Sequence, residues 1–199
     1  NIFALGSQQQ VSFINGMHAS LLLGELIKNK YEMASRWDLA NGWANGDDHG
    51  LFSTGSEPGI AKWSPRPSFY YLYYFQKYFG DMMVESTSTS SNVAVYASQF
   101  TFGEAGIVLV NKNNVDKVVE LTLKNFTPGN RYYTYTLTGG SDNVSFSRKV
   151  YVNGVTTSTI AGGPENYESL KAKSTLISGN IKLNLPKYSV THLVVEKKP

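Results

Sequence analysis

Six residues with binding chemistry fall within a dozen positions after Trp37. Carboxylates, an amide and an imidazole beside an indole ring suit a sugar, because its hydroxyls need hydrogen bonds while its CH faces pack on aromatic rings. This composition favours a sugar-binding loop. The alternative is a solvated loop shaped by local Asx turns. The six residues are Asp38, Asn41, Trp43, Asp47, Asp48 and His49.

Other site chemistries find little support in the sequence. Asp47, Asp48 and His49 are adjacent, so they cannot all point at one metal ion, and no further histidine follows nearby. The three scattered histidines form no ordered triad with a serine, and no glycine-rich phosphate loop occurs. We therefore expect no metal and no cofactor.

The composition limits the class of protein. The chain has 199 residues, 41% hydrophobic and only 17% charged, which indicates a globular chain of one large or two small domains. Its net charge of +3 comes from scattered basic residues, so we expect no nucleic-acid partner. No apolar run approaches the ~18 residues of a membrane span, so we expect no membrane partner. The absence of cysteine excludes disulfide frameworks and thiol catalysis.

The elements that must position the loop differ between two parts of the chain. Helical spacing of apolar residues predicts a helix over 8–29, and a buried strand is expected over 31–40. A long loop rich in Gly, Asn, Asp and Pro covers 41–67, and a second helix is predicted over 69–79. This order is typical of the end of a βα repeat, so residues 1–80 are predicted to be one domain.

Residues 81–199 are predicted to form an antiparallel β-sandwich, because short strand signals alternate with turn signals. The strongest is Asn153-Gly154, whose residue types suit a type I′ hairpin turn. The predicted strands cover 93–98, 106–110, 118–123, 131–137, 145–152, 155–160, 181–185 and 190–196.

The first 80 residues leave a gap in this architecture. Two βα units cannot close a parallel barrel, which takes roughly 250 residues. The predicted fold class is therefore mixed: an incomplete β/α barrel remnant of two βα units, followed by the antiparallel β-sandwich. The chain is expected to be a mature product or a piece of something longer.

Several short motifs give the chain a family resemblance that covers nearly its whole length. It resembles the carboxy-terminal part of clan A glycoside hydrolases of the α-L-arabinofuranosidase, β-xylosidase and xylanase type. The matching motifs are Asn-Gly-Met-His-Ala at 15–19, Ser-Arg-Trp-Asp-Leu at 35–39, His-Gly-Leu-Phe at 49–52, Pro-Arg-Pro-Ser-Phe-Tyr-Tyr at 65–71 and Leu-Asn-Leu-Pro-Lys-Tyr-Ser-Val-Thr at 183–191.

The resemblance implies that both catalytic glutamates lie upstream of this chain. If Asn1 matches the Asn of the family's nucleophile motif, the nucleophile lies about two residues before it. Residues 31–40 would match barrel strand eight, and Trp37 the strand-eight Trp that lines the sugar subsite, the alternative being a large core residue. A retaining enzyme needs two carboxyls about 5 to 5.5 Å apart, so this chain alone is expected to be inactive.

The resemblance further implies the biological setting. The parent protein is expected to be a secreted, extracellular or periplasmic bacterial glycoside hydrolase that degrades plant or algal cell-wall polysaccharide. We expect its substrate-binding residues in this chain to be Trp37, from the resemblance, and Asp38, Trp43 and His49, from the composition of the loop. The partners are the polysaccharide and the missing barrel portion, and an unpaired sandwich edge favours oligomers. The alternative is a non-catalytic carbohydrate-binding or structural β-sandwich module.

Overall fold

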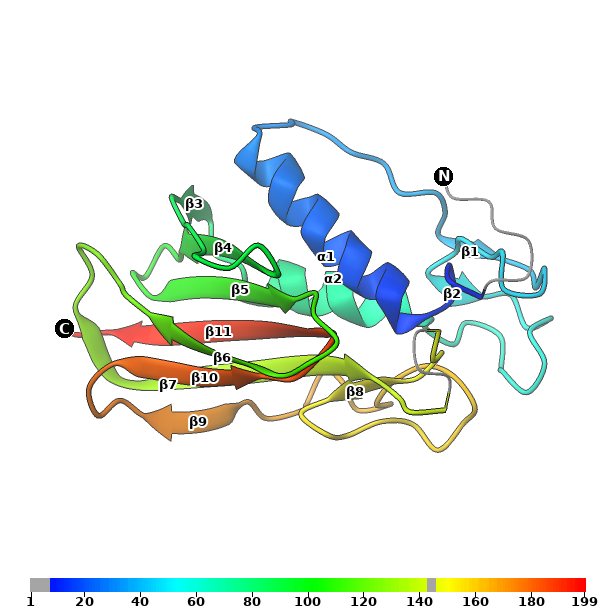
Figure 1. Cartoon of the computed structure of the whole chain (residues 1–199). Helices are drawn as coiled ribbons and strands as arrows, with labels where there is room; N and C mark the ends of the chain where they lie inside the picture. The colour runs from blue at the N-terminus through cyan, green and yellow to red at the C-terminus, as the bar shows by residue number, and fades with distance from the viewer. Residues whose placement is uncertain (1–7, 143–145) are drawn as a thin grey trace. The chain divides into compact units, whose positions relative to one another are not determined.

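The computed structural model describes residues 8–142 and 146–199 and divides the chain into two compact units (Figure 1). The first unit comprises Asn1–Tyr73 and Leu137–Leu170, and the second comprises Tyr74–Thr136 and Lys171–Pro199. Asn1, which the resemblance aligned with the nucleophile motif, lies outside the described residues. Over the described ranges, neither helix is long and apolar enough to cross a membrane.

Two helices form where the sequence predicted them, with shifted ends. Helix α1 spans Phe13–Lys28 and starts five residues later than predicted, with Ser12 at its N-cap. Helix α2 spans Pro67–Tyr78 and begins at a proline, whose missing N–H costs nothing in the first turn. Gly16 of α1 lies against Tyr71 of α2, because a Cβ at position 16 would come within 2.1 Å of the Tyr71 ring.

The predicted buried strand over 31–40 is wrong. Residues 31–38 are irregular, and only Ala40–Asn41 form a strand, β1, which pairs in parallel with β2, Phe52–Ser53. A barrel strand is held by hydrogen bonds to a neighbour on each side. Residues 31–38 pair with no strand in the part of the chain that the structure describes, so their apolar side chains remain in solvent.

The second unit contains most of two antiparallel sheets, while β8 and the last three residues of β7 belong to the first unit. The larger sheet has the strand order β3-β4-β5-β11-β7-β8, with β9 paired to β7, and the smaller sheet pairs β6 with β10. The bounds are β3 Met82–Val84, β4 Val93–Gln99, β5 Ala105–Asn111, β6 Lys117–Leu121, β7 Pro128–Gly139, β8 Val150–Val152, β9 Lys173–Leu176, β10 Ile181–Leu185 and β11 Ser189–Lys197.

An apolar core lies between these two layers, as expected for a β-sandwich. Strand β10 alternates buried and exposed residues, so Leu183 and Leu185 face the core while Lys182 and Asn184 face solvent. The buried core residues come from both layers: Val93, Ile107, Leu109, Tyr132, Ile181, Leu183, Leu185, Leu193 and Val195.

The sequence located most of the strands but overestimated one hairpin. The Asn153-Gly154 turn is confirmed, since both residues have positive φ, 50° and 88°. The strand predicted over 155–160 is wrong: after one mutual pair of bonds between Val152 and Val155, the chain turns away. The hydroxyl of Thr156 bonds to the Val150 carbonyl instead, a local bond that competes with strand pairing. The short strands β3 and β9 were not predicted.

Aromatic side chains of α2 pack in both units. Those up to Tyr73 belong to the first unit, and those from Tyr74 onward belong to the second. In the second unit, Tyr74 and Tyr78 lie 5.0 and 4.5 Å from the Tyr135 ring, measured between centroids. In the first unit, Phe69 and Tyr73 pack edge-on against Tyr167. These rings therefore serve packing within each unit.

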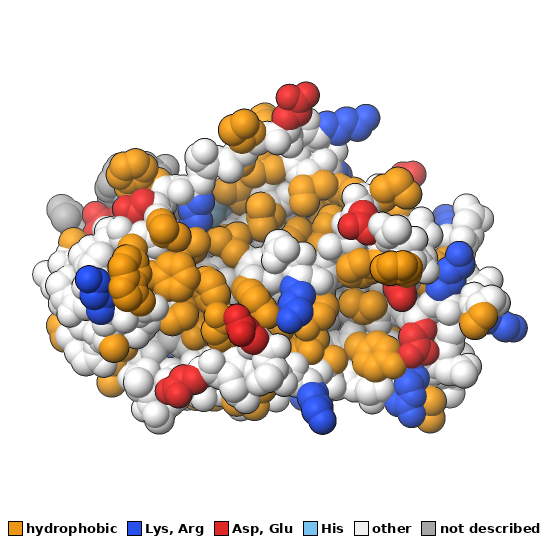
Figure 2. Space-filling view, turned by 180° about the vertical axis from the view of Figure 1, so that it is seen from behind, with side chains coloured by type: hydrophobic (Ala, Val, Ile, Leu, Met, Phe, Trp, Pro, Cys, Tyr) orange, Lys and Arg blue, Asp and Glu red, His pale blue; other side chains and the backbone are white. Residues whose placement is uncertain are grey.

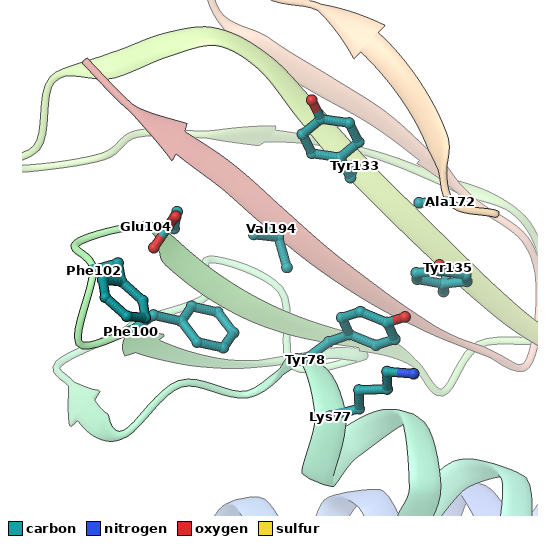
Figure 3. Close-up of a pocket in the computed structure, with 9 residues that line it drawn as sticks. All are labelled: Lys77, Tyr78, Phe100, Phe102, Glu104, Tyr133, Tyr135, Ala172 and Val194. Atoms are coloured by element: carbon teal, nitrogen blue, oxygen red, sulfur yellow. The ribbon is translucent and has the colours of Figure 1, made fainter. Parts of the chain in front are cut away.

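Hydrophobic side chains also reach the surface, as Figure 2 shows for one face of the molecule. The second unit has a hollow of about 410 Å³ with an aromatic lining that includes Tyr78, Phe100, Phe102 and Tyr135 (Figure 3). Phe102 stands out because 89% of its side chain is exposed.

Candidate functional site

The loop that carries the predicted sugar-binding residues is fastened at both ends. The backbone N–H of Leu51 donates to the Asp38 carbonyl at 3.1 Å, and that of Phe52 donates to the Leu39 carbonyl at 3.0 Å. Thr54 donates to the Asn41 carbonyl at 3.2 Å. The segments before and after residues 42–50 are therefore joined by backbone hydrogen bonds. These bonds hold the two ends of the loop together.

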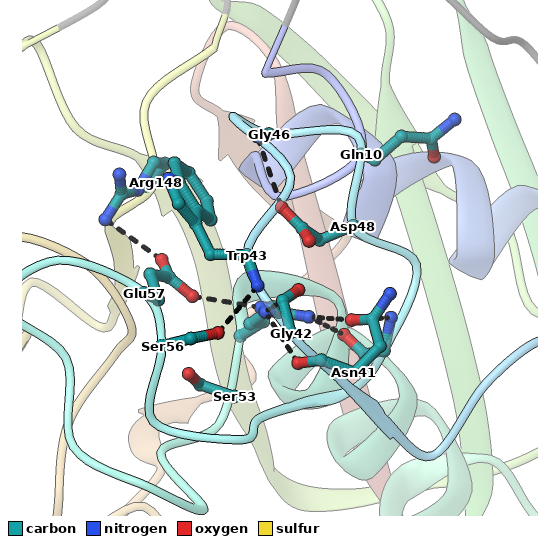
Figure 4. A network of polar contacts seen from close by, with 12 residues as sticks. Gln10, Asn41, Gly42, Trp43, Gly46, Asp48, Ser53, Ser56, Glu57 and Arg148 are labelled. Carbon is teal, nitrogen blue, oxygen red and sulfur yellow. Dashed lines mark hydrogen bonds and ion pairs between the residues drawn. The ribbon is translucent and has the colours of Figure 1, made fainter.

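A buried ion network stabilises this loop (Figure 4). Glu57 and Arg66 are each only 3% exposed, and the Arg66 Nε–H donates to Glu57 Oε2 at 3.1 Å. A second guanidinium, that of Arg148, lies with its Nη2 3.0 Å from Glu57 Oε1. One buried carboxylate thus holds two cations, which leaves a net positive charge in a region of low solvent access.

The remaining nitrogens of Arg66 connect the two ends of the loop. They donate to the side chain and carbonyl of Asn41, to the Gly42 carbonyl and to the Gly50 carbonyl. Asn41 Oδ1 also accepts the Gly50 N–H at 3.1 Å. Asn41 and Arg66 therefore act as braces of the loop. The sequence offered no periodic signal for Arg66, because its partners lie between nine and 25 residues away.

Trp43 and His49, two of the predicted binding residues, lie half-buried on this loop. The Trp43 backbone N–H donates to Ser56 Oγ at 2.8 Å, and the Arg148 guanidinium lies 4.8 Å from the centre of its ring. His49 Nε2 lies 3.9 Å from Asp47 Oδ1. One face of the Trp43 ring is thus occupied by a cation, a contact that orients the ring.

Asp48 shapes the loop around itself. It is 1% exposed, and its carboxylate accepts the backbone N–H groups of Ala44 at 2.8 Å and of Gly46 at 3.2 Å. These are local bonds from the side chain to preceding backbone, and they differ from the Asx turns raised from the sequence, in which the side chain accepts the N–H two residues further on. Over residues 8–142 and 146–199, no group of three or more His, Asp or Glu is arranged to hold a metal ion.

Trp37 and Asp38 lie at the start of the segment that forms backbone hydrogen bonds to the far end of the loop. The Trp37 side chain is 75% exposed, and the peptide bond between the two residues is cis. Asp38 is half-buried, and its Oδ1 is shielded from solvent with no hydrogen-bond partner among the described residues. A buried acceptor without a donor is costly, so this oxygen is ready to receive a donor from a ligand or from further polypeptide.

One aromatic residue of the same loop escaped the sequence analysis. Trp63 is 58% exposed and has a φ of 66°, a conformation that bulky residues rarely adopt. Its only sequence signal was its residue type, a tryptophan within a stretch rich in glycine and proline.

The second unit contains a buried titratable group that serves packing. His192 of β11 is 1% exposed and lies beside the rings of Tyr74 and Phe75. Burial lowers its pKa to about 3, and neither ring nitrogen has a hydrogen-bond partner among the described residues. His192 is therefore neutral at physiological pH and unsuited to proton transfer there.

Comparison with known proteins gives structural matches only. No family model matches the chain, and no curated protein sequence matches it. The fold is similar to that of an arabinose-bound GH51 α-L-arabinofuranosidase, with a TM-score of 0.65 and 16% identity over 94% of this chain and 28% of that one. An α-L-arabinofuranosidase from Thermotoga maritima, also in complex with arabinose, gives 0.63 and 16% over 93% and 38%.

A GH30 endoxylanase from Clostridium papyrosolvens gives a TM-score of 0.55 and 17% identity over 93% of this chain and 39% of that one. The resemblance inferred from sequence motifs is thus confirmed at the level of the fold. The chain spans about 28–39% of the length of these solved structures.

Proposed function

We propose that this chain is the C-terminal part of a retaining glycoside hydrolase that acts on plant or algal cell-wall polysaccharide. In this proposal residues 1–80 supply the last two βα units of a TIM-type barrel, and residues 81–199 form the sandwich that braces it. The fold match to part of several such enzymes supports the assignment, since the chain aligns along nearly its whole length and covers about a third of theirs.

The observation that carries the proposal is the segment Tyr31–Leu39. At alternate positions Tyr31, Met33, Trp37 and Leu39 leave 66%, 85%, 75% and 67% of their side chains in solvent. Large apolar groups spaced by two are typical of a strand that buries one face. A run of this kind without a strand partner is unfavourable in water, and neighbouring barrel strands would cover it.

The proposal places the catalytic carboxylates in preceding polypeptide. Retaining hydrolysis needs one carboxylate as nucleophile and a second carboxyl, about 5 to 5.5 Å away, as acid and then base. The two most buried loop carboxylates are already engaged: Glu57 binds two guanidinium groups, and Asp48 accepts two backbone N–H groups. Neither is free to attack a sugar or protonate a leaving group.

The residues of this chain would bind and orient the sugar. The exposed Trp37 indole would pack on a sugar ring, and the unpartnered Asp38 Oδ1 would accept a hydrogen bond from a sugar hydroxyl. Trp43, held by Arg148, and His49 would contact the substrate from the loop. Residues 31–38 are irregular in this chain, and in the proposal they become the eighth strand only when preceding barrel strands pair with them. Barrel active sites are built at the C-terminal ends of the strands, which is where this loop would then lie.

The remaining parts of the proposal concern the setting. The parent enzyme would be secreted, in the extracellular space or the periplasm, where its polysaccharide substrate is found. Without the missing barrel portion, the exposed segment Tyr31–Leu39 would favour association between copies of the chain. No cofactor takes part in the proposed chemistry, because two carboxyls suffice.

Reading the coding sequence upstream of Asn1 tests this proposal. We expect a glutamate codon two or three positions before Asn1, preceded by roughly six further βα units. A secretion signal directly adjoining Asn1 would contradict it.

A second candidate function, a non-catalytic carbohydrate-binding module, is favoured by the hollow in the second unit. Its aromatic lining is accompanied by Lys77 and Glu104, so it combines ring faces with hydrogen-bonding groups (Figure 3). Affinity electrophoresis in gels containing xylan or arabinan distinguishes the two functions. Retardation that Phe102→Ala abolishes would favour the module, and a bracing sandwich would leave migration independent of Phe102.

A further inference from the structure

In the turn Ala61–Ser64, Trp63 adopts a backbone conformation that is unfavourable for a residue with a bulky side chain. The Ser64 N–H donates to the Ala61 carbonyl at 3.2 Å, and Trp63 occupies the third position of the turn with a φ of 66°. Glycine or asparagine normally fills that position, because the Cβ of other residues crowds the neighbouring carbonyl. A tryptophan there reduces the stability of the turn. Strain of this kind is typical of positions whose side chain has a functional role.

The turn is fixed in place by the strand beside it. The Trp63 N–H donates to the Ser53 carbonyl at 2.7 Å, and the Ser53 N–H donates to the Ser64 carbonyl at 3.0 Å. Gly55 lies against Lys62, since a Cβ at position 55 would be 3.1 Å from the Lys62 Cβ. These contacts hold the strained backbone and fix the direction in which the Trp63 side chain leaves it.

The ring itself has one charged neighbour and a large open surface. The Lys62 Nζ lies 5.4 Å from the centre of the Trp63 ring, and 58% of the Trp63 side chain is exposed. The ammonium lies over one face of the ring, as the Arg148 guanidinium does at Trp43, so a ligand would pack on the opposite face. Single exposed aromatic residues are common on protein surfaces, but this one combines exposure with backbone strain and a turn that is held in place.

The Trp63 turn shares its anchor with the loop that carries Trp43. The Ile60 N–H donates to the Glu57 carbonyl at 3.1 Å, and the Glu57 carboxylate holds the Arg148 guanidinium that lies on Trp43. The same buried glutamate therefore supports both aromatic segments. Because Glu57 holds both the Trp43 loop and the Trp63 turn, we expect the two tryptophans to bind the same class of ligand.

We propose that Trp63 and Lys62 form a second sugar-binding subsite, separate from Trp37, that takes one unit of a neutral polysaccharide chain. The indole packs on the CH face of the sugar ring, and the Lys62 ammonium orients the indole from the opposite face. Because the turn is held in place by backbone bonds, little backbone freedom is lost on binding. The substrate class rests on the proposed function, whereas the subsite is built from residues of this chain alone.

Thermal unfolding of the 199-residue chain tests the strain. Trp63→Gly removes the crowded Cβ, so we expect its Tm to rise by about 2–4 °C, while Trp63→Phe keeps the strain and leaves Tm unchanged. A fall in Tm for Trp63→Gly would show that the ring packs for stability and would overturn the subsite.

Binding is tested by titrating the ¹⁵N-labelled chain with xylohexaose and with arabinohexaose, following the indole N–H signals of the three tryptophans. Each signal is assigned with a Trp→Phe variant. We expect the Trp63 signal to shift, and Kd to rise about tenfold for Trp63→Gly and several-fold for Lys62→Met. Val118→Ala, at an exposed position of the second unit outside both proposed sites, is the control and leaves this Kd unchanged. An unmoved Trp63 signal with both sugars overturns the subsite.

Acrylamide quenching separates a sugar subsite from a polypeptide contact. In the protein extended upstream, the Trp63 fluorescence remains accessible if the ring serves a sugar, and becomes protected if further polypeptide covers it, which overturns the proposal. Failure of the proposed function has a different signature. An extended protein without glycosidase activity, in which Trp63 still binds oligosaccharide, contradicts the proposed function and leaves the subsite standing.

Discussion

The two units of this chain are stabilised by different means. In the second unit, leucine and valine side chains fill the space between two sheets, and Leu185, Leu193 and Val195 are fully buried. In the first unit, a buried carboxylate with two guanidinium groups holds an irregular loop, while large apolar side chains of Tyr31–Leu39 remain in solvent. The second unit closes its own core, whereas the first leaves large apolar side chains in solvent.

Breaking the ion network is expected to have the largest effect. Arg66→Met leaves the Glu57 carboxylate buried with one partner fewer, so it should lower the free energy of unfolding by about 3–5 kcal/mol. Urea unfolding followed by tryptophan fluorescence measures this loss. Lys28→Met, which removes only a surface ion pair at 4.0 Å, is the matched control. A loss no larger than that of the control would show that the network does not hold the loop.

Removing apolar volume from the sandwich is expected to cost slightly less. Leu193→Ala should lower the free energy of unfolding by about 3 kcal/mol, because it leaves a cavity in a core where the side chain is fully buried. Leu176→Ala, at a position 62% exposed, should change it little. Far-UV circular dichroism during unfolding reports the effect, and equal stability of the two variants would contradict a closed core.

Acid should weaken the second unit through His192. The imidazole pKa is about 3 when folded and 6.5 in the unfolded chain, so the stabilisation is fully present above pH 6.5 and declines as the pH falls toward 3. From pH 7 to pH 4.5 the expected loss is roughly 2–3 kcal/mol. His192→Leu should remove this part of the pH dependence, while the exposed His18→Leu should retain it. An unchanged acid slope in His192→Leu would disprove the assignment.

Trp37→Ala should separate binding from stability. In the 199-residue chain the unfolding free energy should barely change, because the side chain is 75% exposed. In the complete enzyme kcat/KM should fall more than tenfold, about 1.4 kcal/mol, through lost packing on the sugar ring. Unchanged kinetics in a folded variant would remove Trp37 from the substrate site.

The same contrast explains what could be predicted from sequence. Elements stabilised by local patterns were found, as in β10, where buried and exposed residues alternate, and in the Asn153-Gly154 turn, where residue type determines φ. The segment 31–40 was predicted as a strand from its composition, but a strand requires partners that the described chain lacks. The pattern was therefore informative about residue types and wrong about the structure formed.

The candidate site was less predictable than the fold. The sequence identified the loop and its aromatic and polar residues, yet it missed the brace formed by Glu57, Arg66 and Arg148, whose members lie up to 91 residues apart. It also missed Trp63, because nothing in a single sequence indicates a positive φ at a tryptophan. Long-range contacts and backbone strain arise from the folded chain and leave no periodic trace.

The most direct measurement compares hydrolysis by the 199-residue chain with hydrolysis by the protein extended upstream to the full reading frame. Both are assayed on 4-nitrophenyl α-L-arabinofuranoside, 4-nitrophenyl β-xyloside and xylan, with NMR detection of the anomer first released. We predict no turnover by the chain alone and turnover with retention by the extended protein, abolished by changing the glutamate two or three positions before Asn1 to glutamine. Turnover by the 199-residue chain itself, or an extended protein inactive on all three substrates, would contradict it.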